Sequence, residues 1–124
     1  MTQLIINGTP YPEATRDRYR SYTRDVGDTL RMADGSLVTE IAYTVAVIEY
    51  NYDYFESELM NTCLADLKTG ADLQVMYLPP GGDELVADVF TVTTRPSPLF
   101  AFSKQNVPYW HNISFTLESV NPID

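Results

Sequence analysis

The chain has 124 residues, of which 17 are acidic and 8 are basic, so its formal net charge is −9 at pH 7. This acidity argues against a nucleic-acid-binding protein, because such proteins usually need a basic face to bind phosphates. The sequence has no apolar run near the ~20 residues of a membrane span, and its 44% hydrophobic content is typical of one folded domain, expected over residues 1–124.

The first predicted element is a short strand over residues 4–6, which ends at the Asn-Gly dipeptide at 7–8, a sequence suited to a tight turn. Pro10 and Pro12 then exclude helix and central strand pairing, so we expect an extended run along a sheet edge. Over residues 15–24 the even positions would share one face of a strand. That face would carry Arg16, Arg18, Arg20, Tyr22 and Arg24.

A long hairpin is predicted next. The segments Thr29–Met32 and Ser36–Tyr50 flank Ala33-Asp34-Gly35, whose Asp-Gly step favours a hairpin turn. The second segment alternates an apolar face with a small or mixed face. At ~3.3 Å per residue it would reach about 45 Å, well beyond an ordinary strand of about five or six residues. We therefore expect part of this hairpin to project from the domain.

Only one segment has the periodicity of a helix. Its apolar stripe consists of Phe55, Leu59, Met60, Cys63, Leu64 and Leu67. Asp53 is placed to cap the start of this helix, and Lys68 and Gly70 suit its end. A thiol on such a stripe is more often a small buried apolar group than a nucleophile, so Cys63 is assigned to the core.

Three further strands are predicted over residues 72–78, 85–94 and 111–119, with proline- and glycine-containing breaks between them. The order of strands, one helix and more strands predicts an α+β domain that is mainly β. We expect an antiparallel sheet or a small β-sandwich with one packed α-helix and the long hairpin.

Residues that could carry chemistry are few. Cys63 is the only cysteine and His111 the only histidine, so no zinc site can be built, and the sequence predicts neither a metal nor a cofactor. His111 lies among aromatic residues, where a packed or capping role is favoured over that of a base. An enzyme that uses carboxylates such as Asp83 and Glu84 is the least favoured class. The lone thiol and the absence of a secretory signal pattern indicate synthesis in a reducing cytosol.

Positive charge is concentrated in one segment. Residues 16–31 hold five of the eight basic side chains and sum to a formal +2, which leaves −11 for the rest of the chain. One interpretation is a solvated edge strand that its charges protect from unwanted pairing. The other is a basic strip that meets an acidic surface of an identical neighbour, as head-to-tail contacts around a ring would allow.

Four stretches carry a resemblance to a known family: INGTPYPEATRDRY, RMADGSLVTEIAYTVAVIEYNY, FESELMNTCLADLKTGADLQVMYLPPGGDELVADVFTV and WHNISFTLESV. Together they resemble the small structural proteins encoded among the tail genes of long-tailed bacteriophages and prophages. Those proteins open with an ING strand and carry an arginine-glycine hairpin. They place one E-x-x-x-L-L helix before a strand that ends in Tyr and a Pro/Gly turn, and they close with an aromatic-rich strand.

The resemblance implies a tail-tube-like fold and a virion structural protein of the tail tube, or of the baseplate hub at the tail end, made in the host bacterial cytoplasm. Its partners would be copies of itself in a ring and neighbouring tail proteins, with DNA only as passing cargo. The region Thr29–Tyr50 would reach across to the adjacent subunit. A carboxylate-lined lumen would repel phosphates, which leaves the basic residues for contacts between subunits. The residues expected at those contacts are Arg16, Arg18, Arg20, Arg24, Arg31, Asp34 and Gly35.

Two alternatives stay open at this point. One is a head-to-tail connector component. The other is a carbohydrate- or ligand-binding module at the tail tip, for which exposed aromatic residues would form a platform. The residues of that platform would be Tyr50, Tyr52, Tyr54, Tyr109 and Trp110.

Overall fold

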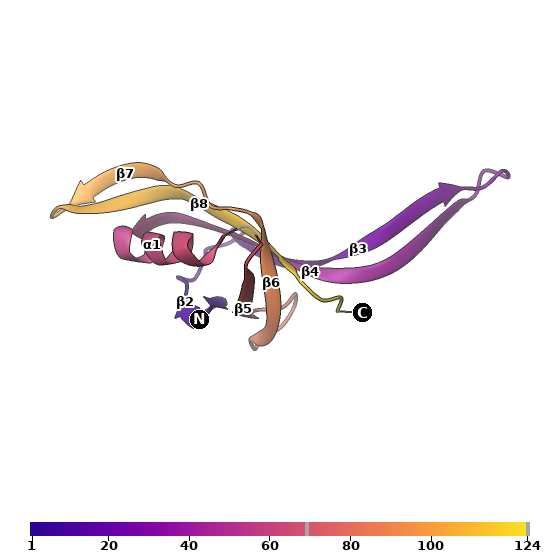
Figure 1. Ribbon diagram of the computed structural model, residues 1–124, viewed down its shortest axis with the longest axis horizontal. Helices are drawn as coiled ribbons and strands as arrows, with labels where there is room; N and C mark the ends of the chain where they lie inside the picture. The colour runs from indigo at the N-terminus through magenta and orange to yellow at the C-terminus, as the bar shows by residue number, and fades with distance from the viewer. Residues whose placement is uncertain (69, 124) are drawn as a thin grey trace.

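The computed structural model describes residues 1–68 and 70–123 and has the predicted α+β class, mainly β, with antiparallel strands and a single short helix (Figure 1). The helix is α1 (Ser57–Asp66), which packs beneath the sheet in the view of Figure 1. The strands are β1 (Leu4–Ile6), β2 (Thr9–Pro10), β3 (Tyr19–Arg31), β4 (Leu37–Glu56), β5 (Asp72–Tyr77), β6 (Val86–Thr94), β7 (Leu99–Lys104) and β8 (Val107–Ser119).

The strands form one hydrogen-bonded sheet in the order β2-β1-β5-β6-β8-β4-β3, with β7 paired to β8. The single sheet, rather than a sandwich of two, is therefore the arrangement that forms. It coils strongly, and β6 runs across the direction of β4 and β8 in Figure 1. Coiling brings β3 close to the end of β5, where the Tyr19 hydroxyl donates to the Leu78 carbonyl at 2.8 Å. The Leu78 N–H in turn continues the pairing of β5 with β1 by donating to the Gln3 carbonyl at 2.9 Å.

The predicted turn after the first strand joins β1 to β2. Asn7 and Gly8 have φ values of 49° and 83°, in the left-handed region that asparagine and glycine tolerate. β2 ends at Pro10 and lies at the edge of the sheet, which confirms the position predicted from a residue without an N–H.

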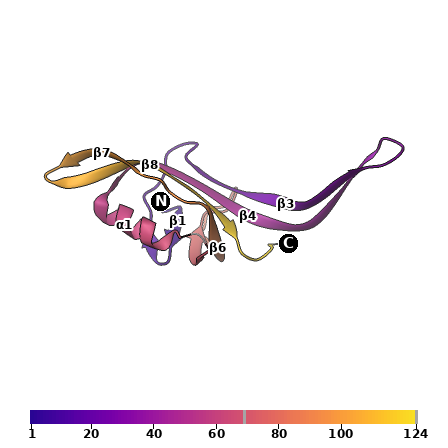
Figure 2. The same cartoon turned by 45° about the horizontal axis from the view of Figure 1, so that its top comes forward.

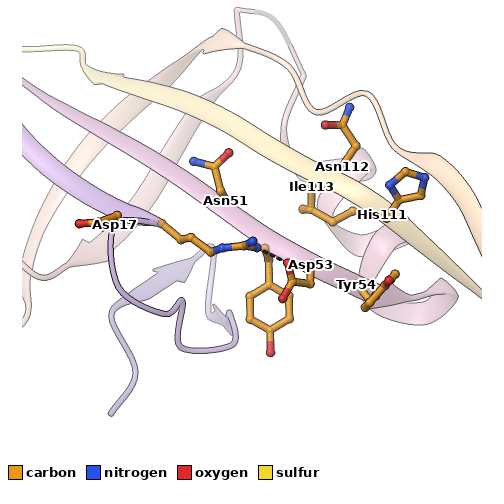
Figure 3. Close-up of a pocket in the computed structure, with 9 residues that line it drawn as sticks. Asp17, Asn51, Asp53, Tyr54, His111, Asn112 and Ile113 are labelled. Atoms are coloured by element: carbon orange, nitrogen blue, oxygen red, sulfur yellow. Dashed lines mark hydrogen bonds and ion pairs between the residues drawn. The ribbon is translucent and has the colours of Figure 1, made fainter.

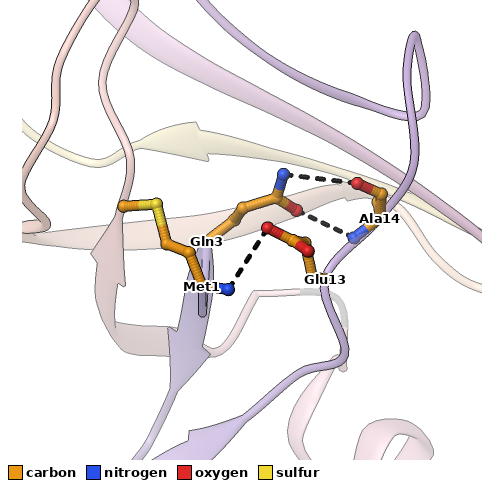
Figure 4. Close-up of polar contacts among 4 residues, drawn as sticks. All are labelled: Met1, Gln3, Glu13 and Ala14. Atoms are coloured by element: carbon orange, nitrogen blue, oxygen red, sulfur yellow. Dashed lines mark hydrogen bonds and ion pairs between the residues drawn. The ribbon is translucent and has the colours of Figure 1, made fainter.

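A strap over residues 11–16 leads from β2 back across the core to β3. Figure 4 shows how Gln3 holds it: the Gln3 side chain donates to the Ala14 carbonyl at 3.3 Å and accepts from the Ala14 N–H at 2.9 Å. The terminal amino group of Met1 adds an ion pair with Glu13 at 3.3 Å. These contacts fix the point at which the arginine-rich segment enters the sheet.

Helix α1 confirms the predicted helix, and its buried side chains Met60 and Cys63 lie on the predicted stripe. The predicted cap is wrong, because Asp53 lies within β4 and forms an ion pair with Arg18. Glu56 occupies the capping position and its side chain makes no capping hydrogen bond. The pairing of β4 with β8 continues to Glu56, so the strand ladder keeps this segment extended and decides where the helix begins.

The core lies between the helix and the concave side of the sheet, and it is rich in aromatic rings. Phe115 is 1% exposed, and its ring stacks on that of Tyr50 with the centroids 5.1 Å apart. The ring of Tyr11, carried by the strap, meets both at 5.9 Å. The other large side chains buried to the same degree are Phe55, Phe90, Leu4, Ile6, Ile48, Met60, Leu67, Leu73, Ile113 and Leu117.

The strands after the helix fall close to their predicted positions, but β8 begins four residues early and β7 was not predicted at all. β7 and β8 form a second hairpin, whose turn residues Gln105 and Asn106 have φ values of 52° and 63°. Pro96 and Pro98 lie just before β7. Because proline disfavours a strand, the sequence pattern did not predict one here. Figure 1 shows this hairpin at the end of the sheet opposite to the β3–β4 hairpin.

The predicted hairpin over Thr29–Tyr50 is confirmed, and it is longer than expected because β3 is continuous from Tyr19 to Arg31. Gly35 has a φ of 89° at its turn. Hydrogen bonds from the hydroxyl and N–H of Ser36 hold the pKa of Asp34 below its ordinary value. Figure 2 shows the hairpin running well beyond the rest of the sheet.

The strand predicted over residues 15–24 is wrong at its start. Arg16 and Arg18 precede β3, in a turn closed by a hydrogen bond from the Arg18 N–H to the Thr15 carbonyl at 3.0 Å. Asp17 has a left-handed φ of 67° in this turn. The strap has to reverse direction before it can join β4, so the alternating pattern begins only at Tyr19.

Stability should fall as the pH rises above about 9, because burial raises the pKa of Cys63 from 9.0 to about 11 and that of Tyr19 from 10.0 to about 12. The unfolded chain then loses these protons before the folded chain does, so the free energy of unfolding decreases between about pH 9 and pH 12. Urea midpoints at pH 8, 10 and 11 measure this decrease. A Cys63→Ala variant should show a shallower decrease between pH 9 and 11, and a midpoint that stays constant with pH would contradict the burial of both groups.

Candidate functional site

The outer part of the β3–β4 hairpin, residues 26–43, is called the ribbon below. It stands apart from the rest of the sheet (Figures 1 and 2). At the end of β8, Ser119 Oγ accepts from the Ala46 N–H of β4 at 2.9 Å. In the tail after β8, the Ile123 N–H donates to the Thr44 carbonyl of β4, also at 2.9 Å. From Thr44 toward the hairpin turn, β3 is the only strand of the described chain that pairs with β4.

The ribbon is therefore a two-stranded sheet with two open edges. It also exposes apolar side chains: Met32 is 46% exposed, Leu37 57% and Tyr43 41%. A two-stranded ribbon is at best marginally stable on its own in water, and an open edge offers unpaired N–H and C=O groups to another chain. These properties make the ribbon a candidate contact surface.

Three of the five arginines predicted at subunit contacts have acidic partners on β4 or β8. The ion pairs are Arg18 with Asp53, Arg20 with Glu49 at 3.6 Å, and Arg24 with Glu118 at 2.7 Å. All three arginine side chains are at least 42% exposed, so each pair contributes little to stability. Much of the charge of the basic strip is thus balanced locally, and its contact with a neighbouring copy stays a prediction.

These arginines also cover apolar side chains. Arg24 and Tyr22 lie opposite Val45 and Val47 in the β3–β4 ladder, and the Arg20 guanidinium lies 4.3 Å from the centre of the Tyr22 ring. The two valines are only 3% exposed, although they lie outside the main core cluster. Long arginine stems commonly cover apolar surface in this way, so the strip has a structural role besides any contact.

The remaining predicted contact residues occupy two places. Arg16 is on the strap, with its side chain 95% exposed and in an ion pair with the adjacent Asp17 at 3.9 Å. Arg31, Asp34 and Gly35 gather at the tip of the ribbon, where Arg31 Nη1 donates to the Gly35 carbonyl at 2.8 Å. The structure therefore separates the seven residues into a paired strip, one exposed arginine and the tip.

Charge reversal can distinguish the two roles of the basic strip. Arg20→Glu places a second carboxylate beside Glu49 and should lower the free energy of unfolding by about 0.5–1 kcal/mol. Arg16→Glu, on an exposed side chain, should leave it unchanged. If Arg16 and the paired strip both meet a neighbouring copy, both variants weaken assembly as measured by light scattering. If both variants assemble as strongly as the native chain, these arginines have only a structural role.

The β7–β8 hairpin and the segment before it, residues 95–111, are called the arm below. β7 pairs with β8 alone among the described strands, so its outer edge is open. Leu99 is 54% exposed, Phe100 57% and Phe102 42%. Phe102 stacks on Tyr109 with the ring centroids 5.0 Å apart. The sequence signals for the arm were the alternation in LFAFSK and the turn-forming Gln-Asn step.

A polar hollow of about 420 Å³ lies where the strap meets β4 and β8. Figure 3 shows its lining, which is Asp17, Arg18, Asn51, Tyr52, Asp53, Tyr54, His111, Asn112 and Ile113. Two of these, Asp17 and Asn112, have positive φ values, and two others, Arg18 and Asp53, form an ion pair. These groups can hydrogen-bond a polar ligand, but the hollow is open and its central charges are already paired.

The expected aromatic platform forms only in part. Tyr50 is fully buried, its hydroxyl donates to the Pro12 carbonyl at 2.9 Å, and burial raises its pKa. Tyr52 stacks on it and is half-buried. Trp110 is turned toward the helix, where its Nε1–H donates to Ser57 Oγ at 3.3 Å. The aromatic core thus removes Tyr50 from the surface and partly buries Tyr52 and Trp110. Tyr52, Tyr54 and Tyr109 line a hollow of about 450 Å³, and Tyr54, at 50%, is the most exposed of the five.

Among the side chains that the structure describes, no three His, Cys, Asp or Glu gather as a metal site would require. No described helix has the length and apolar character needed to cross a membrane. Comparison of the chain with protein-family models, with curated proteins and with solved structures finds no match.

Proposed function

We propose that this chain is a structural subunit that assembles with copies of itself, as a ring-forming protein of a bacteriophage tail tube or baseplate hub does. The observation that carries this proposal is the ribbon, with two open edges and exposed apolar side chains outside the compact part of the fold. The resemblance of the sequence to small tail proteins supplies the biological setting.

Assembly would give the ribbon what it lacks in a single copy. Pairing with another chain would satisfy its open N–H and C=O groups, and burial of side chains such as Met32 and Leu37 would add an apolar contribution. A projecting element of this kind is costly to keep in an isolated molecule because it invites uncontrolled pairing. Its presence favours a subunit of an assembly over a monomeric binding module.

The charge of the chain fits the same function. A formal charge of −9 would give a ring an acidic lumen, through which DNA could pass without adhering to the wall. Neighbouring tail proteins would then be bound at the ends of the ring. No membrane partner is part of the proposal.

The mass of the native chain in solution tests this function. Light scattering over a range of concentrations should show a transition from monomer to a larger species of defined mass, and electron microscopy of that species should show rings or tubes. A chain that stays monomeric at the highest concentrations, and is absent from purified virus particles, would refute the proposal.

A further inference from the structure

We infer that the contact between copies is head-to-tail, with the ribbon of one copy lying against the open edge of β7 in the arm of the next. This inference rests on the proposed self-assembly and specifies the two surfaces that meet. Three properties of the ribbon and the arm carry it: their charges, their open strand edges and their positions in the molecule.

The two segments have opposite formal charge. The ribbon contains three acidic residues and one arginine, for a formal charge of −2. The arm contains Arg95 and Lys104 and no acidic residue, for a formal charge of +2, in a chain that is acidic overall. Both basic side chains are exposed. A ribbon is therefore attracted to an arm, whereas two ribbons or two arms repel each other.

The two surfaces also match in kind. Each presents a strand edge without a partner in the described chain, so the two can continue one antiparallel or parallel ladder between them. Each exposes apolar side chains: Met32, Leu37 and Tyr43 on the ribbon, and Leu99, Phe100 and Phe102 on the arm. A contact that pairs backbone edges and buries such side chains combines the two main sources of affinity in strand addition.

The ribbon and the arm lie at opposite ends of the elongated sheet in both views (Figures 1 and 2). A molecule cannot bring them together within itself, so they can meet only between copies. Because each copy would use two different surfaces, the contact is heterologous, and repetition gives a closed ring or an open filament rather than a symmetric dimer.

Exchange of the two charges tests the inference. An arm-reversed variant, Arg95→Glu with Lys104→Glu, changes the formal charge of the arm from +2 to −2. A ribbon-reversed variant, Asp28→Lys with Glu40→Lys, changes that of the ribbon from −2 to +2. Each variant alone should need at least a tenfold higher concentration for half-assembly, since like charges then meet (a cost of about 1.4 kcal/mol or more).

An equal mixture of the two variants should regain assembly, because each reversed surface finds its opposite on the other variant. Circular dichroism verifies that both variants are folded. Folded variants that assemble alone as the native chain does, or that fail to assemble when mixed, would overturn the head-to-tail contact while leaving self-assembly of the native chain intact. A native chain that never assembles would instead overturn the proposed function, and this inference with it.

Cross-linking gives a second measurement that does not depend on charge. Ser36→Cys at the ribbon tip and Ser103→Cys in β7 both replace exposed side chains, in a background with the buried Cys63 changed to alanine. A short bis-maleimide should join the Ser36→Cys variant to the Ser103→Cys variant in a mixture, far more than it joins either to itself. Cross-links formed mainly within one variant would show a symmetric contact and overturn the inference.

Discussion

Removal of the ribbon should abolish self-assembly and leave the rest of the domain folded. In the variant, residues 27–42 are replaced by Asn-Gly between Val26 and Tyr43, which face each other in the ladder and can be joined by a two-residue turn. The deleted residues whose side chains the structure describes contribute none of the side chains in the core cluster. The concentration for half-assembly should rise at least about 100-fold, equivalent to about 3 kcal/mol, as measured by light scattering.

The ribbonless variant also has a use in mixtures. It keeps the arm, so it can accept the ribbon of a native copy but cannot extend the assembly further. Added to the native chain, it should reduce the size of the assemblies as its proportion increases. A ribbonless chain that assembles normally, or that leaves native assemblies unchanged in size, would rule out the ribbon as the contact element.

Phe115→Ala should lower the free energy of unfolding by about 3–5 kcal/mol, the usual cost of removing a buried phenylalanine ring from a packed core. The ring is 1% exposed and contacts those of Tyr50 and Tyr11, which the sheet and strap hold in place, so the cavity cannot easily collapse. A loss of this size is a large part of the total stability of a small domain. Urea denaturation of the dilute monomer measures it.

Phe102→Ala is the matched control for Phe115→Ala. The same ring is removed, but from a side chain that is 42% exposed on the arm, so the free energy of unfolding should change by about 1 kcal/mol or less. This variant should instead weaken assembly, because Phe102 lies on the surface assigned to the ribbon of the next copy. Equal destabilisation by the two substitutions would mean that the arm belongs to the folding core.

The parts of the fold that the sequence predicted are those set by local patterns. The Asn-Gly turn after β1, the stripe of α1 with Met60 and Cys63, and the Asp-Gly turn of the long hairpin each depend on residues close together in the chain. Turn preferences and hydrophobic periodicity depend on residues that are close together in the chain, so the sequence alone was enough to predict these elements. The buried thiol was predictable for the same reason.

The parts that were missed depend on partners far along the chain. Asp53 was expected to cap the helix, but pairing with β8 keeps it in a strand. β7 forms because β8 offers it a ladder, despite the prolines before it. Arg18, Arg20 and Arg24 find their acidic partners on β4 and β8, and no sequence spacing reveals these pairs. For the candidate site, the ribbon was predictable and the arm was not.

Hydrogen–deuterium exchange of the assembled native chain tests the contact between copies most directly, because it reports on the backbone edges themselves. Compared with the monomeric arm-reversed variant, the outward amides of β7 and those along one edge of the ribbon should exchange more slowly once the native chain has assembled. Exchange at the strap and at the turn between β5 and β6 should be the same in both. Assemblies in which the ribbon and β7 exchange as fast as in the monomer would contradict the claim that these two edges hold the copies together.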